Sequence, residues 1–310
     1  MKKKFIIKAI ISVLLLYFIL RDVNFSDIYE SIKHADFKIL SLAFSLHFVG
    51  LMLSSIRWKV LLNSQKIKSK LFFLFKSYLV ASFFNHFLPS TVGGDSIRTY
   101  DSWKLGENKE KAFAVVILDR FLGLLTLLIF AIIALLYSPD LSEVIPQLWF
   151  WVFVLSSGAT IIIWFILSPP TLFFKKLGEA KKGIISKIAG FVYKIDVAFS
   201  QFADKKVDLL IAFSLSVILQ LNVVFYYFAI STALGLPVYF IDYFLIVPLV
   251  IFITMIPISF NGIGLRESAL FLFLSTYGVL KSEAIAFAWV EYGMLLMLGV
   301  IGGIIYAFRK

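Results

Sequence analysis

Two related stretches break the long apolar runs of this chain: PSTVGGDSIR at residues 89–98 and PISFNGIGLR at residues 257–266. In each stretch a proline stands nine residues before an arginine, with two glycines in between. Proline and glycine interrupt helices and leave backbone amides without helical partners. Such backbone cannot face lipid, so each stretch is predicted to line protein or a water-filled cavity at membrane depth.

The composition of the chain indicates a membrane setting for these breaks. Of 310 residues, 60% are apolar and 16% are charged, and the mean hydropathy is +0.93. Too few polar residues remain to cover a water-exposed globule, which excludes soluble enzymes, fibrous proteins and disordered tails. The chain has no cysteine, which excludes disulfides, thiolate metal sites and a cysteine nucleophile. The net charge of +11 comes from basic runs between apolar stretches, as membrane topology requires, and no nucleic-acid partner is expected.

The apolar stretches predict an all-α, polytopic integral membrane protein that forms a single domain over residues 1–310. About six full spans are expected, near residues 5–20, 37–62, 112–137, 147–167, 207–234 and 284–308. Two further stretches, 71–94 and 241–280, contain the breaks and are expected to be re-entrant or broken helical hairpins. Ordinary crossings would satisfy the charge pattern equally well for 241–280, so that alternative stays open.

The distribution of lysine and arginine predicts which loops face the cytoplasm. The loop at 168–206 carries eight lysines against three acids, and the connection at 57–70 carries five basic residues. Both loops should be cytoplasmic, as should both termini, in a prokaryotic plasma membrane, with residues 1–20 as an uncleaved signal anchor. The segment 71–94 must then enter and leave on the same side. Apolar residues at helical spacing within 168–206 also predict an amphipathic helix on the inner leaflet.

A weak internal repeat relates the first half of the chain, 1–137, to the second, 147–308. In each half an Ala-x-Ala pattern follows the broken stretch, and an acid comes seven residues after its first alanine, Asp119 in one half and Glu291 in the other. Each half therefore reads as a span, a broken hairpin and a long span with a buried acid. Because the hairpins are predicted to open on opposite faces, the halves would be inverted repeats, an arrangement typical of transporters.

Charged side chains within the apolar stretches are candidates for a binding site. A charge at that depth costs about 2.5 to 3.5 kcal/mol on insertion scales, so it should face the protein interior beside a partner. Free amides next to an arginine suit an anionic group such as phosphate. The predicted substrate-binding residues are Ser90, Thr91, Gly93, Gly94, Asp95, Arg98, Asp119, Arg120, Ser259, Asn261, Gly262, Gly264, Arg266, Glu267 and Glu291. The alternative is purely structural: helix breaks with arginines at an interface, and a buried ion pair between Asp119 and a hairpin arginine.

Signatures of catalysis are lacking in the sequence. Residues 178–183 have the glycine spacing of a Walker A loop but lack its lysine and hydroxyl residue, and neither H-E-x-x-H nor G-x-S-x-G occurs. We therefore expect no catalytic residue, no metal and no cofactor. His86 is interpreted as a hydrogen-bonded residue beside the first break, and His47 as a span residue without a functional role.

The residues around the two breaks resemble those of a known family. FNHFLPSTVGGDSIR at 84–98, LDRFLG at 118–123 and the stretch 257–267 are similar to the transmembrane domain of the lysylphosphatidylglycerol synthase/flippase family. The resemblance implies movement of an aminoacylated phospholipid between leaflets, and related domains accompany polyprenyl-linked glycan pathways. Bifunctional members add a soluble domain that transfers lysine from lysyl-tRNA. This chain ends at Lys310, directly after its last predicted span, so lipid lysinylation is not expected of it.

Two functions follow as hypotheses. The first is a flippase or transporter for an anionic or aminoacylated phospholipid, similar to lysylphosphatidylglycerol, or for a polyprenyl-linked lipid. The second is an accessory membrane module that presents such a lipid to a separate synthase or glycosyltransferase. In both cases the partner is a membrane phospholipid or a lipid-linked substrate.

Overall fold

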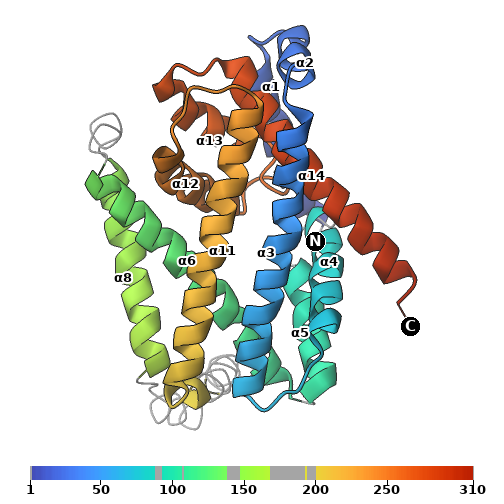
Figure 1. Cartoon of the computed structure of the whole chain (residues 1–310), viewed down its shortest axis with the longest axis vertical. Coiled ribbons are helices and arrows are strands. Elements are labelled where there is room, and N and C mark those ends of the chain that lie inside the picture. The colour runs from blue at the N-terminus through green and yellow to red at the C-terminus, as the bar shows by residue number, and fades with distance from the viewer. Residues whose placement is uncertain are drawn as a thin grey trace.

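The fold is that of a computed structural model, which describes residues 2–87, 93–106, 108–137, 147–167, 193 and 200–309. Throughout these ranges every regular element is a helix, and none is a strand. The α-helices are α1 (Lys2–Leu20), α2 (Phe25–Lys33), α3 (Phe37–Ser64), α4 (Leu71–Phe87), α5 (Gly93–Gly106), α6 (Lys109–Tyr137), α8 (Gln147–Leu167), α11 (Lys206–Ala233), α12 (Tyr243–Met255), α13 (Leu265–Leu274) and α14 (Lys281–Ala307). Two short 3₁₀ helices, η1 (Phe240–Asp242) and η2 (Ser275–Tyr277), adjoin α12 and α13 (Figure 1). The all-α prediction is confirmed for this part of the chain.

Among the described residues, four helices are long and apolar enough to cross a membrane: α3, α6, α11 and α14, each of 27 to 29 residues. At 1.5 Å per residue they are about 40 Å long, which exceeds a hydrocarbon core of about 30 Å. A fifth span results if α1 and α2, which meet at a bend of 83°, count as one. The apolar parts described for α8 and α12 are shorter. The chain is thus a multi-pass helical protein, while the count of six spans stays a prediction.

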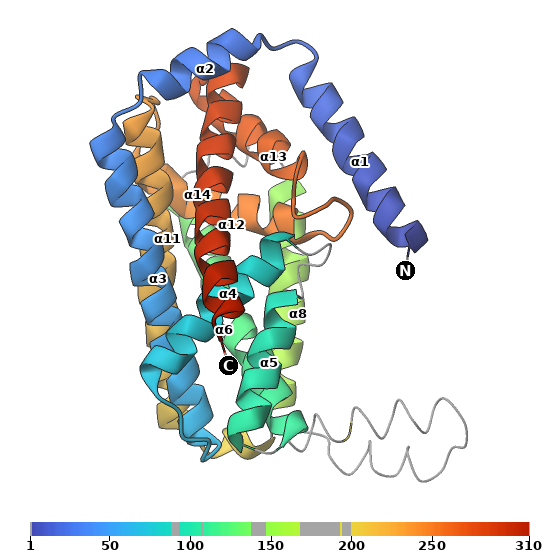
Figure 2. The ribbon, with the colours of Figure 1, turned by 90° about the vertical axis from the view of Figure 1, so that its right-hand side faces the viewer.

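Helices α3 and α11 lie side by side over much of their length (Figures 1 and 2) and form a pair at one side of the molecule in Figure 2. Asp36 caps the start of α3, since its carboxylate accepts hydrogen bonds from the backbone of Lys38 and Ile39. The Asp36 amide in turn donates to the carbonyl of Ala233, the last residue of α11. Farther along, the Asn222 amide donates to the carbonyl of Leu46 at 3.0 Å. These bonds set the register of the pair.

Helices α4 and α5 form a tight hairpin around the first break. In Figure 2, α4 rises from the lower end of the molecule to mid-height and α5 returns to the lower end. A Cβ on Gly93 would lie 2.7 Å from the Phe84 carbonyl oxygen, and one on Gly94 would lie 2.6 Å from that of Ala81. Glycine is required at both positions because any side chain would push α5 away from α4. The Asn85 side chain accepts a hydrogen bond from the Gly94 amide.

Helices α12 and α13 are joined by the second break, residues 256–264, in the upper half of Figure 2. Three residues of this connection adopt the left-handed conformation: Asn261 (φ 51°), Gly262 (φ 76°) and Gly264 (φ 82°). Two glycines and an asparagine are the residues that tolerate this conformation best. Gly264 also lies against α1, because a Cβ there would meet the Leu15 side chain at 2.5 Å.

Helix α14 crosses α4 at very close range. A Cβ on Gly302 would lie 1.8 Å from the Leu79 carbonyl oxygen, and one on Gly303 would lie 2.8 Å from the Phe83 ring. At the end of α14, Arg309 donates to both carboxylate oxygens of the buried Asp101 on α5, at 2.7 and 2.9 Å. Helix α14 is therefore held against both helices of the first hairpin.

Some predicted features lie outside the described residues. The basic loop at 168–206, apart from residue 193 and residues 200–206, is among them, and so is its predicted amphipathic helix. Residues 88–92, which include the candidate site residues Ser90 and Thr91, and residues 138–146 are also outside.

A substitution that adds a single methyl group tests the close crossing of α4 and α14. Gly302→Ala should force the two backbones apart and lower the free energy of unfolding by about 1 to 3 kcal/mol. Gly293→Ala, in the same helix, is the control, because an added Cβ there meets nothing within 4 Å. This control should be neutral or stabilising by up to about 1 kcal/mol. Thermal unfolding in detergent measures both, and equal shifts for the two variants would contradict the close approach.

Candidate functional site

Asp119 in α6 is the centre of a buried network of charged and polar groups. Only 1% of its side chain is exposed. Its carboxylate accepts hydrogen bonds from Arg57 Nε of α3 at 2.6 Å, from Arg98 of α5 at 2.7 Å and from the Tyr78 hydroxyl of α4 at 2.8 Å. Arg57 donates as well to the Ser216 hydroxyl of α11 at 2.8 Å. Residues from five helices thus form this network, and three of the helices donate directly to the carboxylate.

Arg98 is enclosed on all sides by this network. Its guanidinium lies over the rings of Tyr78 and Trp58, at 4.2 and 4.6 Å from their centroids. It also lies 3.8 Å from the mostly buried carboxylate of Asp95, which forms an ion pair with Arg120. Charge pairing and cation–π contacts together offset the cost of burying a guanidinium. The ion pair between Asp119 and a hairpin arginine, one of the two interpretations of the sequence, is therefore formed.

A second pair joins the other broken segment to α14. Arg266, at the start of α13, lies 2.9 Å from a carboxylate oxygen of Glu291, and both side chains are about nine-tenths buried or more. The Arg266 guanidinium stacks over the Tyr292 ring at 4.7 Å. From α11, the Tyr226 hydroxyl donates to the backbone carbonyl of Glu291 at 3.4 Å. Each broken segment thus supplies an arginine that pairs with the acid of the long helix that follows.

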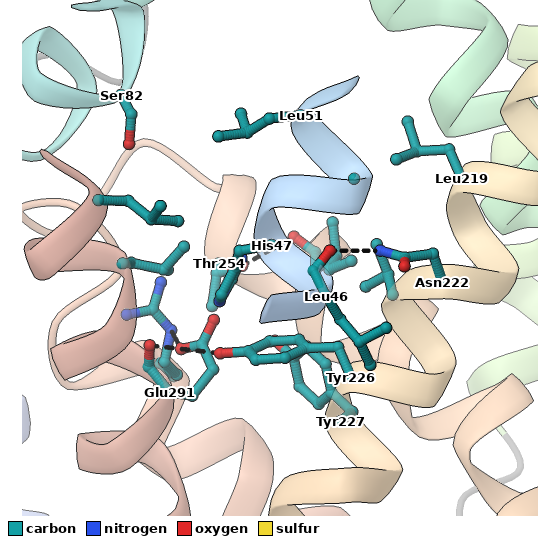
Figure 3. Close-up of a pocket in the computed structure, with 16 residues that line it drawn as sticks. Leu46, His47, Leu51, Ser82, Leu219, Asn222, Tyr226, Tyr227, Thr254 and Glu291 are labelled. Atoms are coloured by element: carbon teal, nitrogen blue, oxygen red, sulfur yellow. Dashed lines mark hydrogen bonds and ion pairs between the residues drawn. The ribbon is translucent and has the colours of Figure 1, made fainter. Parts of the chain in front are cut away.

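The second pair faces a cavity of about 350 Å³. Figure 3 shows Glu291 on the same side of this cavity as Tyr226 and Tyr227. The wall comes from α3, α4, α11, α12, α13 and α14. It consists of Leu46, His47, Gly50, Leu51, Ser82, Leu219, Asn222, Val223, Tyr226, Tyr227, Ile251, Thr254, Arg266, Glu291, Leu295 and Leu298. The exposed surface of the wall is mainly apolar, and Arg266 and Glu291 are its charged members.

A smaller cavity of about 160 Å³ adjoins the first where the two broken segments meet. Its lining includes Asn85 and His86 from the end of α4 and Asn261 from the second break, and it shares Thr254 and Arg266 with the larger cavity. The Asn261 side chain donates to the His86 carbonyl at 2.7 Å. Arg266 is therefore accessible from both cavities.

The predicted site residues divide into three groups. Arg266, Glu291 and Asn261 line the cavities. Arg98 and Asp119 lie inside the buried network, and the ion pair of Asp95 and Arg120 lies at its edge. The remaining described members lie in the two breaks or directly beside them. They are Gly93 and Gly94, which permit the α4–α5 contact, Gly262 and Gly264, which adopt positive φ, Glu267, which accepts from the Gly264 amide, and Ser259, which is buried. The expectation that the amides of Gly93 and Gly94 are free for a ligand is not met by Gly94, because Asn85 binds its amide.

The structure gives two residues surroundings that the sequence did not predict. Arg57 was counted as a basic residue of the 57–70 connection, but it is 5% exposed and neutralises Asp119, so it is no topology signal. His47 was given no role, yet it lines the large cavity with its ring centroid 4.1 Å from that of Tyr226. For Arg57, its place near the end of a long apolar run could have signalled burial. For His47, Tyr226 and Tyr227, no local signal links residues so far apart in the chain.

The chain was also compared with known proteins. Residues 5–303 match the family described as "Lysylphosphatidylglycerol synthase TM region". The chain belongs to this family. Two relatives are similar to this family member: a UPF0104 membrane protein of Methanothermobacter thermautotrophicus, 25% identical over 97% of this chain and 95% of the relative, and one of Pyrococcus horikoshii, 24% identical over 83% and 82%. The resemblance seen in the motifs is therefore confirmed, and the protein is a multi-pass membrane protein.

The network around Asp119 predicts a large stability effect. Asp119→Asn leaves Arg57 and Arg98 buried without a carboxylate, so the free energy of unfolding should fall by about 3 to 5 kcal/mol. Asp204→Asn removes an exposed carboxylate and should change it by less than about 0.5 kcal/mol. Thermal unfolding in detergent compares the two. A small, equal effect of both substitutions would show that the network does not support the fold.

Proposed function

We propose that this family member is a lipid flippase of the prokaryotic plasma membrane that moves an anionic or aminoacylated phospholipid, or a polyprenyl-linked lipid, between leaflets. The observation that carries the proposal is the Arg266–Glu291 pair, which faces a cavity of about 350 Å³ inside a membrane protein. A charged pair in such a place is expensive and marks a substrate pathway by default.

The chemistry of the cavity suits a phospholipid headgroup. The Arg266 guanidinium offers a fork of donors that matches phosphate, and Glu291 beside it can accept a hydrogen bond from an ammonium or hydroxyl group. The volume lies within the usual range for small-molecule sites, about 300 to 1,000 Å³. It accommodates a headgroup but not two acyl chains. The acyl chains would stay in lipid while the headgroup crosses.

Inverted repeats would supply the two alternating openings. We take residues 1–137 and 147–308 as the repeats, with six spans and two re-entrant hairpins, and with both termini in the cytoplasm. Two observations support this arrangement. Arg98 pairs with Asp119 as Arg266 pairs with Glu291, and the two broken segments meet at the bond between Asn261 and His86. Broken segments that face each other form the substrate site in transporters built this way.

The test of transport is a reconstituted assay with lysylphosphatidylglycerol. Its amine can be scored in the outer leaflet of proteoliposomes with a membrane-impermeant amine reagent. The double variant Arg266→Gln/Glu291→Gln removes both charges, so neither is left unpaired, and it should slow transfer at least about tenfold while it unfolds near the wild-type temperature. Arg21→Gln/Glu30→Gln removes an exposed charge of each sign and should transfer normally.

Three results would count against a flippase. Full transfer by a folded double variant would remove the cavity from the pathway. Equal loss in the control pair would show a general effect of charge. A wild-type protein that binds the lipid but transfers none would favour the accessory role, in which a separate synthase or glycosyltransferase takes the lipid.

The re-entrant path of α4 and α5 has its own test. Because the chain contains no cysteine, single cysteines at Lys68 and Lys104, on either side of the hairpin, can be labelled without background. Both should react only with reagent on the cytoplasmic side, since basic flanks stay inside. A cysteine at Asn24 should react only from the other side. Labelling of Lys68→Cys and Lys104→Cys from opposite sides would make the segment an ordinary span.

A further inference from the structure

Helix α5 has one face packed into the protein and one face turned outward. The buried face carries Gly94, Arg98, Asp101 and Ser102. Asp101 is bound there by the bidentate Arg309 and by the Ser77 hydroxyl of α4 at 2.5 Å. These bonds fix the rotation of α5 about its axis. The opposite stripe, at residues 96, 99, 100 and 103, is therefore held away from α4.

This outward stripe forms one wall of a groove of about 550 Å³ between α5 and α6. The lining residues are Asp95, Ser96, Thr99, Tyr100, Trp103, Lys109, Glu110, Phe113, Val116 and Ile117. The α5 wall is mainly polar and aromatic, whereas the α6 wall is apolar from Phe113 onward. None of these residues lines the two cavities around Arg266. The groove is thus a separate site.

The lower end of the groove carries a basic, aromatic rim. The Lys109 ammonium lies 4.0 Å from the centroid of the Trp103 ring, and the Lys104 ammonium lies 5.2 Å from that of Tyr100. Lys104 and Lys109 are exposed, and Tyr100 is 46% exposed. Lysine with tryptophan and tyrosine is the combination found where a membrane protein meets the headgroup layer. The lysines attract anionic headgroups, each by a modest amount that adds along the rim.

The two walls of the groove differ in polarity, so they suit an occupant that is polar at one end and apolar at the other. In a membrane, the hydroxyls of Thr99 and Tyr100 are costly to leave against acyl chains. Phe113 and Ile117 on the facing wall, in contrast, offer nothing to a polar group. A phospholipid satisfies both walls when its headgroup lies at the lysine rim and an acyl chain lies along α6.

We propose that the groove between α5 and α6 is a second lipid site, which holds an anionic phospholipid with its phosphate at Lys104 and Lys109 and an acyl chain against Phe113, Val116 and Ile117. The site binds a resident lipid of the headgroup layer and does not depend on transport. Its lipid is selected by headgroup charge, because the rim supplies two ammonium groups and the acyl wall is not selective.

Photolabelling in nanodiscs tests this site. Phosphatidylglycerol that carries a diazirine in its acyl chain is compared with phosphatidylcholine of the same chains, and label on peptides from residues 110–120 is quantified by mass spectrometry. We expect stronger labelling from phosphatidylglycerol. Lys104→Gln/Lys109→Gln should reduce that labelling roughly tenfold, toward the phosphatidylcholine level.

The matched control, Lys66→Gln/Lys111→Gln, removes the same charge from two lysines that neither line the groove nor lie over the Tyr100 or Trp103 ring. It should label like the wild type. Equal labelling by both lipids, or an equal loss in the control, would overturn the proposal and leave only non-specific lipid around the protein. The Arg266→Gln/Glu291→Gln variant should keep full labelling, so the groove and the transport cavity can fail independently.

Discussion

The buried carboxylate of Asp119 is the group on which the packing of the lower half of the molecule depends. A carboxylate at this depth is stable only with full pairing, and it receives donors from α3, α4 and α5. Each donor fixes one helix against α6, and Arg57 adds α11 through Ser216. The hairpin of α4 and α5 can therefore be short and broken and still be held in place.

The second arginine–acid pair occupies the same place in its half of the sequence as the first pair does, but its surroundings differ. Asp119 accepts hydrogen bonds from two arginines and the Tyr78 hydroxyl, and only 1% of its side chain is exposed. Glu291 has one arginine, Arg266, and faces a cavity whose wall is mostly apolar. In the first half the arginine–acid pair joins helices inside a buried network, whereas in the second half the pair lines a cavity. The proposed headgroup site follows from that difference.

Glycines allow close contacts between helices in this fold, a role that the sequence motifs alone did not indicate. The motif glycines at 93 and 94 were expected to expose amides, but their positions are set by the contact of α5 with α4. The same holds at Gly302, where α14 crosses α4. Helices in a membrane gain little from apolar burial against one another, so close backbone contact and buried polar bonds hold them together. The first hairpin has both close backbone contacts and buried polar bonds.

The sequence by itself determined that the protein lies in a membrane, that it is helical, where its two breaks lie and which arginines and acids belong to them. Those features are local: apolar length, helix breakers and charges within apolar runs carry their own signals. Only the tertiary structure decided which groups neutralise each acid, where a cavity remains and which face of α5 is exposed. Arg57 and Asp119 lie 62 residues apart, Arg57 and Ser216 lie 159 apart, and Asp101 and Arg309 lie 208 apart. Contacts over such distances depend on how whole helices pack, and a single sequence carries no local mark of them.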